Sequence, residues 1–166
     1  MSYSAEEAES LFFHREWSFY MKSNKSSWRK ENFIKMYKIK TVADMWRILN
    51  NISVKFTGNT NIFFMEGDTI PLWEEDKDLW LGGGCWSTVI KGSDWSYCMN
   101  EICSIVMGET VFDDRIVKGI CVVPVAANHS IIKLWTTSDA KEIGVNLTKS
   151  LHECNCCNAR FKSFAH

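Results

Sequence analysis

Segments with the two-residue period of β-strands outnumber segments with a helical period in this chain of 166 residues. In one of them, Phe33, Lys35, Tyr37 and Ile39 alternate with the residues between them, which predicts a strand. Two later segments, rich in β-branched residues and joined by a short polar connection, predict a hairpin. The predicted strands are 16–23, 33–40, 61–66, 85–91, 116–126, 130–137 and 159–166.

Three segments show the apolar spacing of amphipathic helices. A polar residue precedes each of them and is expected to cap it: Thr41, Ser93 and Ser138. Asp44 follows Thr41 in the arrangement of a capping box, and Gly108 is expected to end the second helix. The apolar stripes are Met45, Leu49 and Ile52 in the helix that ends near residue 52, Trp95, Met99, Ile102 and Val106 in the helix over 94–107, and Ile143, Leu147 and Leu151 in the third.

This order of elements predicts an α+β fold, a mainly antiparallel sheet with about three helices packed on one face. The other face of the sheet is then available for binding. The length suits a single domain, which we assign to residues 15–166. The polar and acidic segment before it, residues 1–14, is expected to be a flexible leader and no signal peptide.

The nearly balanced charge limits what the chain can bind. Its net charge is -1 and its isoelectric point is about 6.4, whereas proteins that hold long nucleic acids through their phosphates are usually basic. We therefore expect no tight binding of a duplex, while binding of a short charged nucleotide end stays open. The chain has no apolar run long enough to span a membrane, and we expect no membrane partner.

Seven cysteines without a secretory leader indicate free thiols in a reducing compartment, which favours a cytoplasmic protein. The end of the chain carries His152, Cys154, Cys156 and Cys157. This cluster lacks the Cys-x-x-Cys spacing that is typical of zinc sites, so we expect no metal and no other cofactor. The glycines at 82–84 lack the lysine of a phosphate loop, and no histidine is positioned to activate Cys85. We expect a binding protein and no enzyme.

Eight tryptophans are the most unusual feature of the composition. Large indoles usually pack in a core, and those expected to do so are Trp17, Trp86 and Trp95. Trp28 and Trp73 instead lie in polar segments. An indole face attracts a cationic or electron-poor ring, and two facing indoles can hold a flat base between them. The carboxylate of Glu74 can accept hydrogen bonds from the edge of such a base.

Five motifs occur in the order and nearly at the spacing of one known family. They are Trp17 with Phe19-Tyr20-Met21-Lys22, Thr41-Val42-Ala43-Asp44-Met45-Trp46, Ile70-Pro71-Leu72-Trp73-Glu74 with Gly82-Gly83, Gly108-Glu109, and Leu134-Trp135-Thr136-Thr137. Over roughly residues 17–151 the chain resembles the mRNA cap-binding family of eukaryotic translation initiation factor 4E. The resemblance implies a curved antiparallel sheet with three helices on its convex face.

The resemblance also implies a site for the 7-methylguanosine cap at the 5′ end of mRNA. Trp28 and Trp73 would stack on the two faces of 7-methylguanine, which methylation makes cationic. Glu74 would accept hydrogen bonds from the N1 and N2 hydrogens of the base, and Trp135 would pack against the methyl group. The implied function is to bring capped mRNA to the translation initiation machinery.

The basic residues with which the family holds the cap phosphates are missing. Their positions carry Cys85, Ala126, Asn128 and Ile131, although charge-assisted hydrogen bonds contribute about 1.5–3 kcal/mol each. The loop before the glycines is longer than is usual in the family, and its Trp80 is a candidate for stacking on a second nucleotide, with a core or lid position as the alternative. The candidates for other phosphate or second-nucleotide contacts are Asn128, His129, Ser130, Lys133, Arg160 and Lys162.

A scaffold protein resembling initiation factor 4G is the implied partner, bound by the helices behind the sheet. The positions concerned are Val42, Trp46, Asn100, Glu101, Ser104 and Gly108. Asn100 and Ser104 replace two expected leucines, so the groove for an amphipathic helix is half polar. We expect a monomer. Two alternatives are a cap-binding regulator with a different partner, and a protein-interaction module that has kept the fold and lost its affinity for caps.

Overall fold

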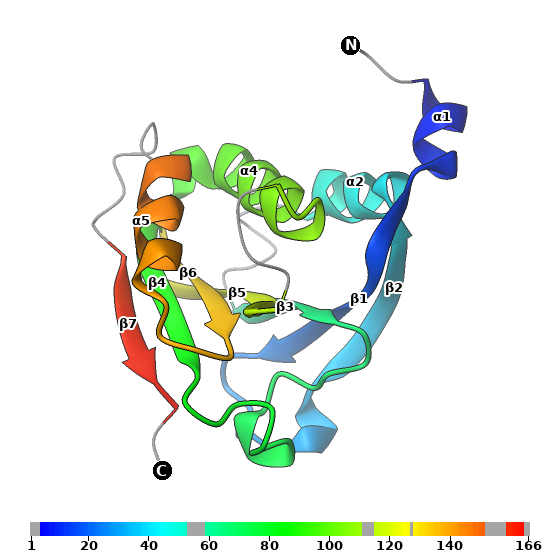
Figure 1. Ribbon diagram of the computed structural model, residues 1–166. Helices are drawn as coiled ribbons and strands as arrows, with labels where there is room; N and C mark the ends of the chain where they lie inside the picture. Colours follow the sequence, from blue (N-terminus) through cyan, green and yellow to red (C-terminus); the bar gives the residue numbers. More distant parts are fainter. Residues whose placement is uncertain (1–3, 53–58, 111–114, 127, 152–158, 165–166) are drawn as a thin grey trace.

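A curved sheet of seven strands forms the centre of the molecule (Figure 1) in the part of the chain that the structure describes. This computed structural model describes residues 4–52, 59–110, 115–126, 128–151 and 159–164. Neighbouring strands are antiparallel throughout, in the order β2-β1-β3-β5-β6-β4-β7. The strands are β1 (Phe12–Ser23), β2 (Ile34–Thr41), β3 (Thr60–Glu66), β4 (Gly84–Lys91), β5 (Val117–Ala126), β6 (His129–Thr136) and β7 (Arg160–Ser163).

Three helices lie together on one face of this sheet (Figure 1): α2 (Val42–Asn51), α4 (Trp95–Met107) and α5 (Lys141–Ser150). This arrangement confirms the predicted α+β fold, including the predicted hairpin of β5 and β6. The shorter elements are the helix α1 (Ala5–Ser10) and the 3₁₀ turns η1 (Lys30–Asn32), η2 (Trp73–Glu75) and η3 (Gly92–Asp94).

The first of the three predicted helices begins as expected, and the other two do not. Thr41 accepts from the N–H of Asp44, whose carboxylate accepts from the N–H of Thr41, so the capping box is confirmed. Ser93 lies in the extra turn η3, and Asp94 occupies the cap position of α4 without a capping bond from its side chain. In α5 the cap position belongs to Ala140 and not to Ser138. Both serine predictions are wrong because additional residues separate each serine from its helix.

Both faces of the sheet are buried at its centre. Along β3, Ile62 and Phe64 pack toward the helices, whereas Phe63 and Met65 pack in a second cluster on the opposite face. The helix-side core contains the predicted apolar stripes, with Trp17 and Trp95 buried as expected and with Trp86 and Ile52 partly buried against it. The second cluster contains Tyr20, Phe33, Phe63, Met65, Leu72, Trp80, Cys85, Cys121, Trp135 and Phe164. This second, aromatic cluster supports the site described below.

The sheet begins earlier in the chain than the pattern of residues predicts. β1 starts at Phe12, four residues before the predicted strand, and α1 precedes it. Glu9 on α1 forms an ion pair with Arg47 on α2. Part of the segment 1–14, which we expected to be a flexible leader, thus forms regular structure beside α2.

Candidate functional site

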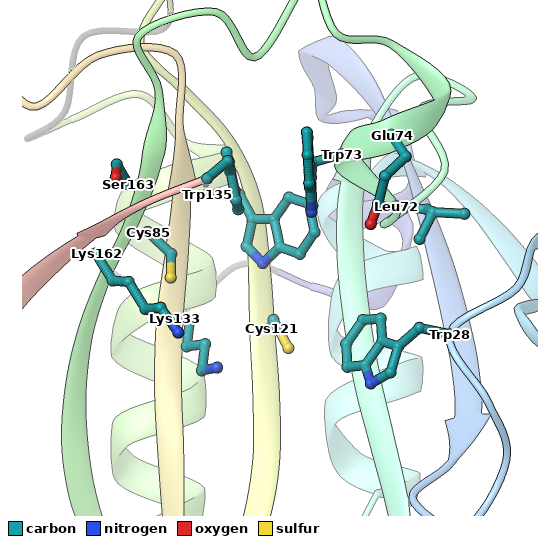
Figure 2. Close-up of a pocket in the computed structure, with 11 residues that line it drawn as sticks. Trp28, Leu72, Trp73, Glu74, Cys85, Cys121, Lys133, Trp135, Lys162 and Ser163 are labelled. Atoms are coloured by element: carbon teal, nitrogen blue, oxygen red, sulfur yellow. The ribbon is translucent and has the colours of Figure 1, made fainter. Parts of the chain in front are cut away.

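A pocket of about 340 Å³ opens on the face of the sheet opposite to the helices (Figure 2). Four aromatic residues line it: Trp28, Trp73, Trp135 and Phe164. The remaining lining residues are Leu72, Glu74, Cys85, Cys121, Lys133, Lys162 and Ser163. The chain thus brings together, from three separate segments, all four residues that the sequence predicts for contacts with a base.

Trp28 follows the end of β1 and remains 52% exposed although three residues contact it. Its ring centroid lies 5.6 Å from that of Phe33 and 6.1 Å from that of Phe63, which meets it almost at a right angle. The ammonium group of Lys22 lies 4.9 Å from the centroid of the indole. These contacts hold the ring while about half of its surface stays accessible to a ligand.

Trp73 and Glu74 lie on the single turn η2. On the same turn, Glu75 accepts a hydrogen bond from the ammonium of Lys30 at 3.2 Å, which joins this loop to the loop of Trp28. Both charged groups are exposed, so this ion pair contributes little stability. In Figure 2 the carboxylate of Glu74 lies on the same side of the pocket as Trp28 and Trp73. An acceptor for a base edge is therefore located beside the two indoles.

The floor of the pocket is a cluster of aromatic rings. The ring centroid of Trp80 lies 5.3 Å from that of Trp135 and 5.4 Å from that of Phe164, with an angle of 75° between the ring planes in each case. Trp135 is 5% exposed and lines the pocket, whereas Trp80 is 1% exposed and does not. Trp80 is therefore a core residue, which was the alternative to a stacking role. Its assignment to a second nucleotide is wrong, because its indole is buried beneath the site.

Phe164 lines the pocket although nothing in the sequence pattern marked it as a site residue. Its ring is nearly parallel to that of Trp73, with 9° between the planes and 6.4 Å between the centroids. Its backbone N–H donates to the carbonyl of Gly83 at 3.1 Å, which fixes the end of β7 beside the loop of Trp73. The predicted strand over 159–166 gave no indication of which strand it pairs with, so the residues facing the pocket could not be assigned. Leu72, Cys121 and Ser163 were missed as well.

Of the six candidates for phosphate contacts, Lys133 and Lys162 line the pocket. Ser130 is 6% exposed, and it has the strand parity of Ile132 and Leu134, which pack under the helices. The prediction for Ser130 is therefore wrong, because its side chain lies on the other face of the sheet.

The three remaining candidates lie outside the pocket lining. Asn128 lies in the turn between β5 and β6, where its carbonyl accepts from the N–H of Gly92, and His129 is the first residue of β6. Trp135 lies six positions after His129 on β6, which is about 20 Å along an extended strand. These two predictions are wrong for this pocket because the turn lies at the far end of the strand. Arg160 lies on β7, opposite Ser87 of β4 and next to the pocket.

Two buried cysteine thiols form part of the pocket wall. Burial raises the pKa of Cys85, while the nearby ammonium groups of Lys133 and Lys162 act in the opposite direction. Burial raises the pKa of Cys121 to about 12. Both thiols are therefore uncharged at neutral pH, and the positive charge of this wall comes from the lysines.

The six residues predicted to contact a scaffold lie on two neighbouring helices. Val42 and Trp46 belong to α2, Asn100, Glu101 and Ser104 belong to α4, and Gly108 ends α4. All except Gly108 are partly buried. The two helices contact each other, so these residues belong to one layer of the molecule, on the face opposite to the pocket.

Within the described ranges, no helix combines the length and the apolar character needed to cross a membrane. No group of three or more potential metal ligands occurs among the described residues either. The cluster of His152, Cys154, Cys156 and Cys157 lies outside them.

Comparison with known proteins agrees with this architecture. A family model described as eukaryotic initiation factor 4E matches residues 12–164. A structure of Ascaris suum eIF4E-3 with an m2,2,7G cap has a TM-score of 0.75 at 19% identity, covering 93% of this chain and 92% of that one. A complex of C. elegans eIF4E-3 with the 4E-binding protein Mextli has a TM-score of 0.75 at 17% identity, covering 93% of each chain.

A third structure, schistosome eIF4E complexed with m7GpppA and 4E-BP, has a TM-score of 0.76 at 20% identity and covers 93% of this chain and 88% of that one. At these identities the structural likenesses show the fold. The family match spans most of the chain and both loops of the pocket. The chain therefore belongs to the eukaryotic initiation factor 4E family.

Proposed function

We propose that this chain binds the 7-methylguanosine cap of mRNA in the aromatic pocket and brings capped mRNA to the translation initiation machinery. The observation that carries the proposal is the convergence of Trp28, Trp73, Glu74 and Trp135 on one pocket of about 340 Å³. The structures of similar fold with caps, from Ascaris suum and from a schistosome, support it. The function is binding, without a chemical step.

The chemistry of these side chains suits a methylated guanine. N7-methylation leaves a positive charge on the base, and the indole faces of Trp28 and Trp73 attract such a ring more strongly than a neutral one. Glu74 accepts hydrogen bonds from the N1 and N2 hydrogens, which the positive charge strengthens. Trp135, at the floor, offers an apolar contact to the methyl group.

The partner proposed for the helical face is a scaffold protein that binds through an amphipathic helix. The likeness to the Mextli and 4E-BP complexes supports this. Because Asn100 and Ser104 occur where the family pattern has leucines, we expect weaker docking of an unmodified scaffold peptide than in members that carry both leucines.

A neighbouring pair of carboxylates allows a matched test of the base contact. Calorimetric titration with 7-methyl-GDP should show at least about tenfold weaker binding by the Glu74→Gln variant, because a charge-assisted acceptor is lost. Glu75→Gln is the control, since Glu75 pairs with Lys30 and does not line the pocket. It should bind within about twofold of the unaltered chain, as is usual for an exposed pair.

A second pair of variants tests the stacking. Trp73→Leu should abolish binding of 7-methyl-GDP, and Trp46→Leu, on the helical face, should leave it intact. Equal effects of Glu74→Gln and Glu75→Gln, or full binding by Trp73→Leu, would refute the assignment of the site.

One observation favours a second function. Cys85 and Ile131 replace basic residues of the family pattern, which fits an interaction module that has lost its affinity for caps. Binding of a scaffold peptide without any binding of 7-methyl-GDP would support that module over the cap-binding function.

A further inference from the structure

The edge strand β7 brings a positive charge to the position next to Cys85. Cys85 on β4 is the direct partner of Trp135 on β6 and of Lys162 on β7. Residues paired in this way point to the same face of an antiparallel sheet. Trp135, Cys85 and Lys162 therefore form one row across three strands, and all three line the pocket.

A second row of side chains lies beside the first. It contains Cys121 on β5, Lys133 on β6, Ser87 on β4 and Arg160 on β7. The second row shares a face with the first, because side chains two residues apart on one strand point the same way. This spacing relates Lys133 to Trp135, Ser87 to Cys85 and Arg160 to Lys162. Cys121 is paired directly with Lys133. Lys133 on β6 and Lys162 on β7 lie on the two sides of β4, at the positions paired with Ser87 and Cys85. Arg160 extends the positive surface beyond the pocket.

These cations have no carboxylate partner among the described residues. The ion pairs of the described residues involve other lysines and arginines. Glu74 is the one carboxylate in the lining of the pocket. Figure 2 shows Glu74 beside Trp28 and Trp73 on one side, and Lys133 and Lys162 together on the other. The pocket thus has an acidic end and a basic end, which would orient a ligand that carries both hydrogen-bond donors and a negative charge.

The backbones of β4 and β7 approach each other closely at Gly84 and Lys162. A Cβ atom on Gly84 would lie 2.3 Å from the carbonyl oxygen of Lys162, so a side chain there would push β7 away. The end of the strand is fixed by the bond from the N–H of Phe164 to Gly83 and by the burial of the Phe164 ring. The backbone of Lys162 is therefore positioned by the same contacts that complete the aromatic floor, and its side chain lines the pocket.

We propose that Lys162 and Lys133 bind the phosphate chain of the ligand, with the edge strand β7 supplying the charge that β4 lacks at Cys85. This assignment rests on the proposed function, since the aromatic side of the pocket would hold the base. The recognised class is a nucleotide whose 5′ phosphates extend from the base toward β7.

The test compares ligands with and without phosphate. The unaltered chain, Lys162→Met and Lys133→Met are titrated with 7-methylguanosine and with 7-methyl-GTP, and the affinity for 7-methyl-GTP is measured at several salt concentrations. Methionine keeps the apolar stem of lysine and removes its charge. Lys91→Met is the matched control, because Lys91 is an exposed lysine at the far end of β4. Thermal unfolding of each variant verifies the fold.

We expect each pocket variant to bind 7-methyl-GTP about tenfold more weakly or worse, to bind 7-methylguanosine as the unaltered chain does, and to show a shallower dependence on salt. Unchanged binding of 7-methyl-GTP would overturn the assignment of the phosphate site. An equal loss for the nucleoside and the nucleotide would also overturn it, because the lysines would then act on the base or the fold. If the unaltered chain binds neither ligand, the proposed function fails and the phosphate site fails with it.

Discussion

The ammonium group of Lys22 lies 4.9 Å from the centroid of the Trp28 indole. Lys22 is 1% exposed, and its ammonium donates to the carbonyls of Ser23 at 2.9 Å and of Ser26 at 2.6 Å. Burial lowers the pKa of this lysine, and the two carbonyls and the ring offset the cost of burying the charge. The same group therefore fixes the turn after β1 and holds the ring that we propose to stack on the base.

Replacement of Lys22 by methionine should increase the preference for a methylated base. A cationic base on the exposed face of Trp28 would lie about 8 Å from the Lys22 charge, and at an intermediate dielectric the repulsion is about 1 kcal/mol. We expect the ratio of the dissociation constants for GTP and 7-methyl-GTP to rise about fivefold in Lys22→Met. The ratio isolates the charge effect, since a less firmly held Trp28 indole would weaken the binding of both ligands alike.

Lys25→Met is the control for this prediction, because Lys25 lies exposed in the same turn. Its ratio should equal that of the unaltered chain. A ratio that falls in Lys22→Met, or that changes equally in both variants, would contradict the proposed arrangement of base, indole and lysine.

A glycine-to-alanine change in α5 should destabilise the protein, although it usually stabilises a helix by about 1 kcal/mol. A Cβ atom on Gly144 would lie 2.3 Å from the Trp86 ring, and the rigid indole cannot give way without moving β4. We expect Gly144→Ala to lower the free energy of unfolding by about 1–3 kcal/mol, as measured in urea. In a Trp86→Leu background the same change should cost much less. An equal cost in both backgrounds would show that the contact is not the cause.

Asp44 should contribute to stability at neutral pH and lose this contribution in acid. Burial alone would raise its pKa, but donation by the N–H groups of Lys40 and Thr41 holds the pKa below its usual value. A carboxyl with a lowered folded pKa stabilises fully above its unfolded pKa of about 4, and the contribution is lost as the pH falls through the folded value. Loss of the cap in Asp44→Ala should cost about 1–2 kcal/mol at pH 7.

Urea unfolding at pH 7 and at pH 3 tests this linkage. The difference between Asp44→Ala and the unaltered chain should shrink at pH 3. Asp94→Ala is the control, since Asp94 occupies a cap position without a capping bond and should cost little at either pH. A difference for Asp44→Ala that is the same at both pH values would argue against the capping carboxylate.

The order of elements could be predicted because it depends on local patterns. The alternation in β2, the stripes of the helices and the capping box of Thr41 and Asp44 are properties of neighbouring residues. The start of β1 at Phe12 could not be predicted, because the pairing of Phe12 with Thr41 of β2 is a tertiary contact. The caps of α4 and α5 differ from the expected serines because each helix begins one or two residues later.

For the candidate site, too, local features could be predicted from the sequence and long-range features could not. The polar surroundings of Trp28 and Trp73 indicated exposed rings, and both line the pocket. Trp80 lies in an equally polar loop, but the indole packs beneath Trp135, which depends on how that loop folds back. Phe164 could be identified, and Lys162 could be selected from the six candidates, only once the pairing of β7 with β4 was known, because strand register is a long-range property.

The most direct test of the proposed function is a titration of the unaltered chain with 7-methyl-GTP and GTP in parallel, followed by tryptophan fluorescence. Stacking of a methylated base on Trp28 and Trp73 should quench the emission, and the affinity for 7-methyl-GTP should exceed that for GTP by at least about tenfold, since the cationic ring gains about 1–2 kcal/mol or more from the indoles. Quenching by 7-methyl-GTP at low micromolar concentration, with little effect of GTP, is the predicted result. Equal quenching by both nucleotides, or none by either at high micromolar concentration, would contradict the assignment of this pocket to the mRNA cap.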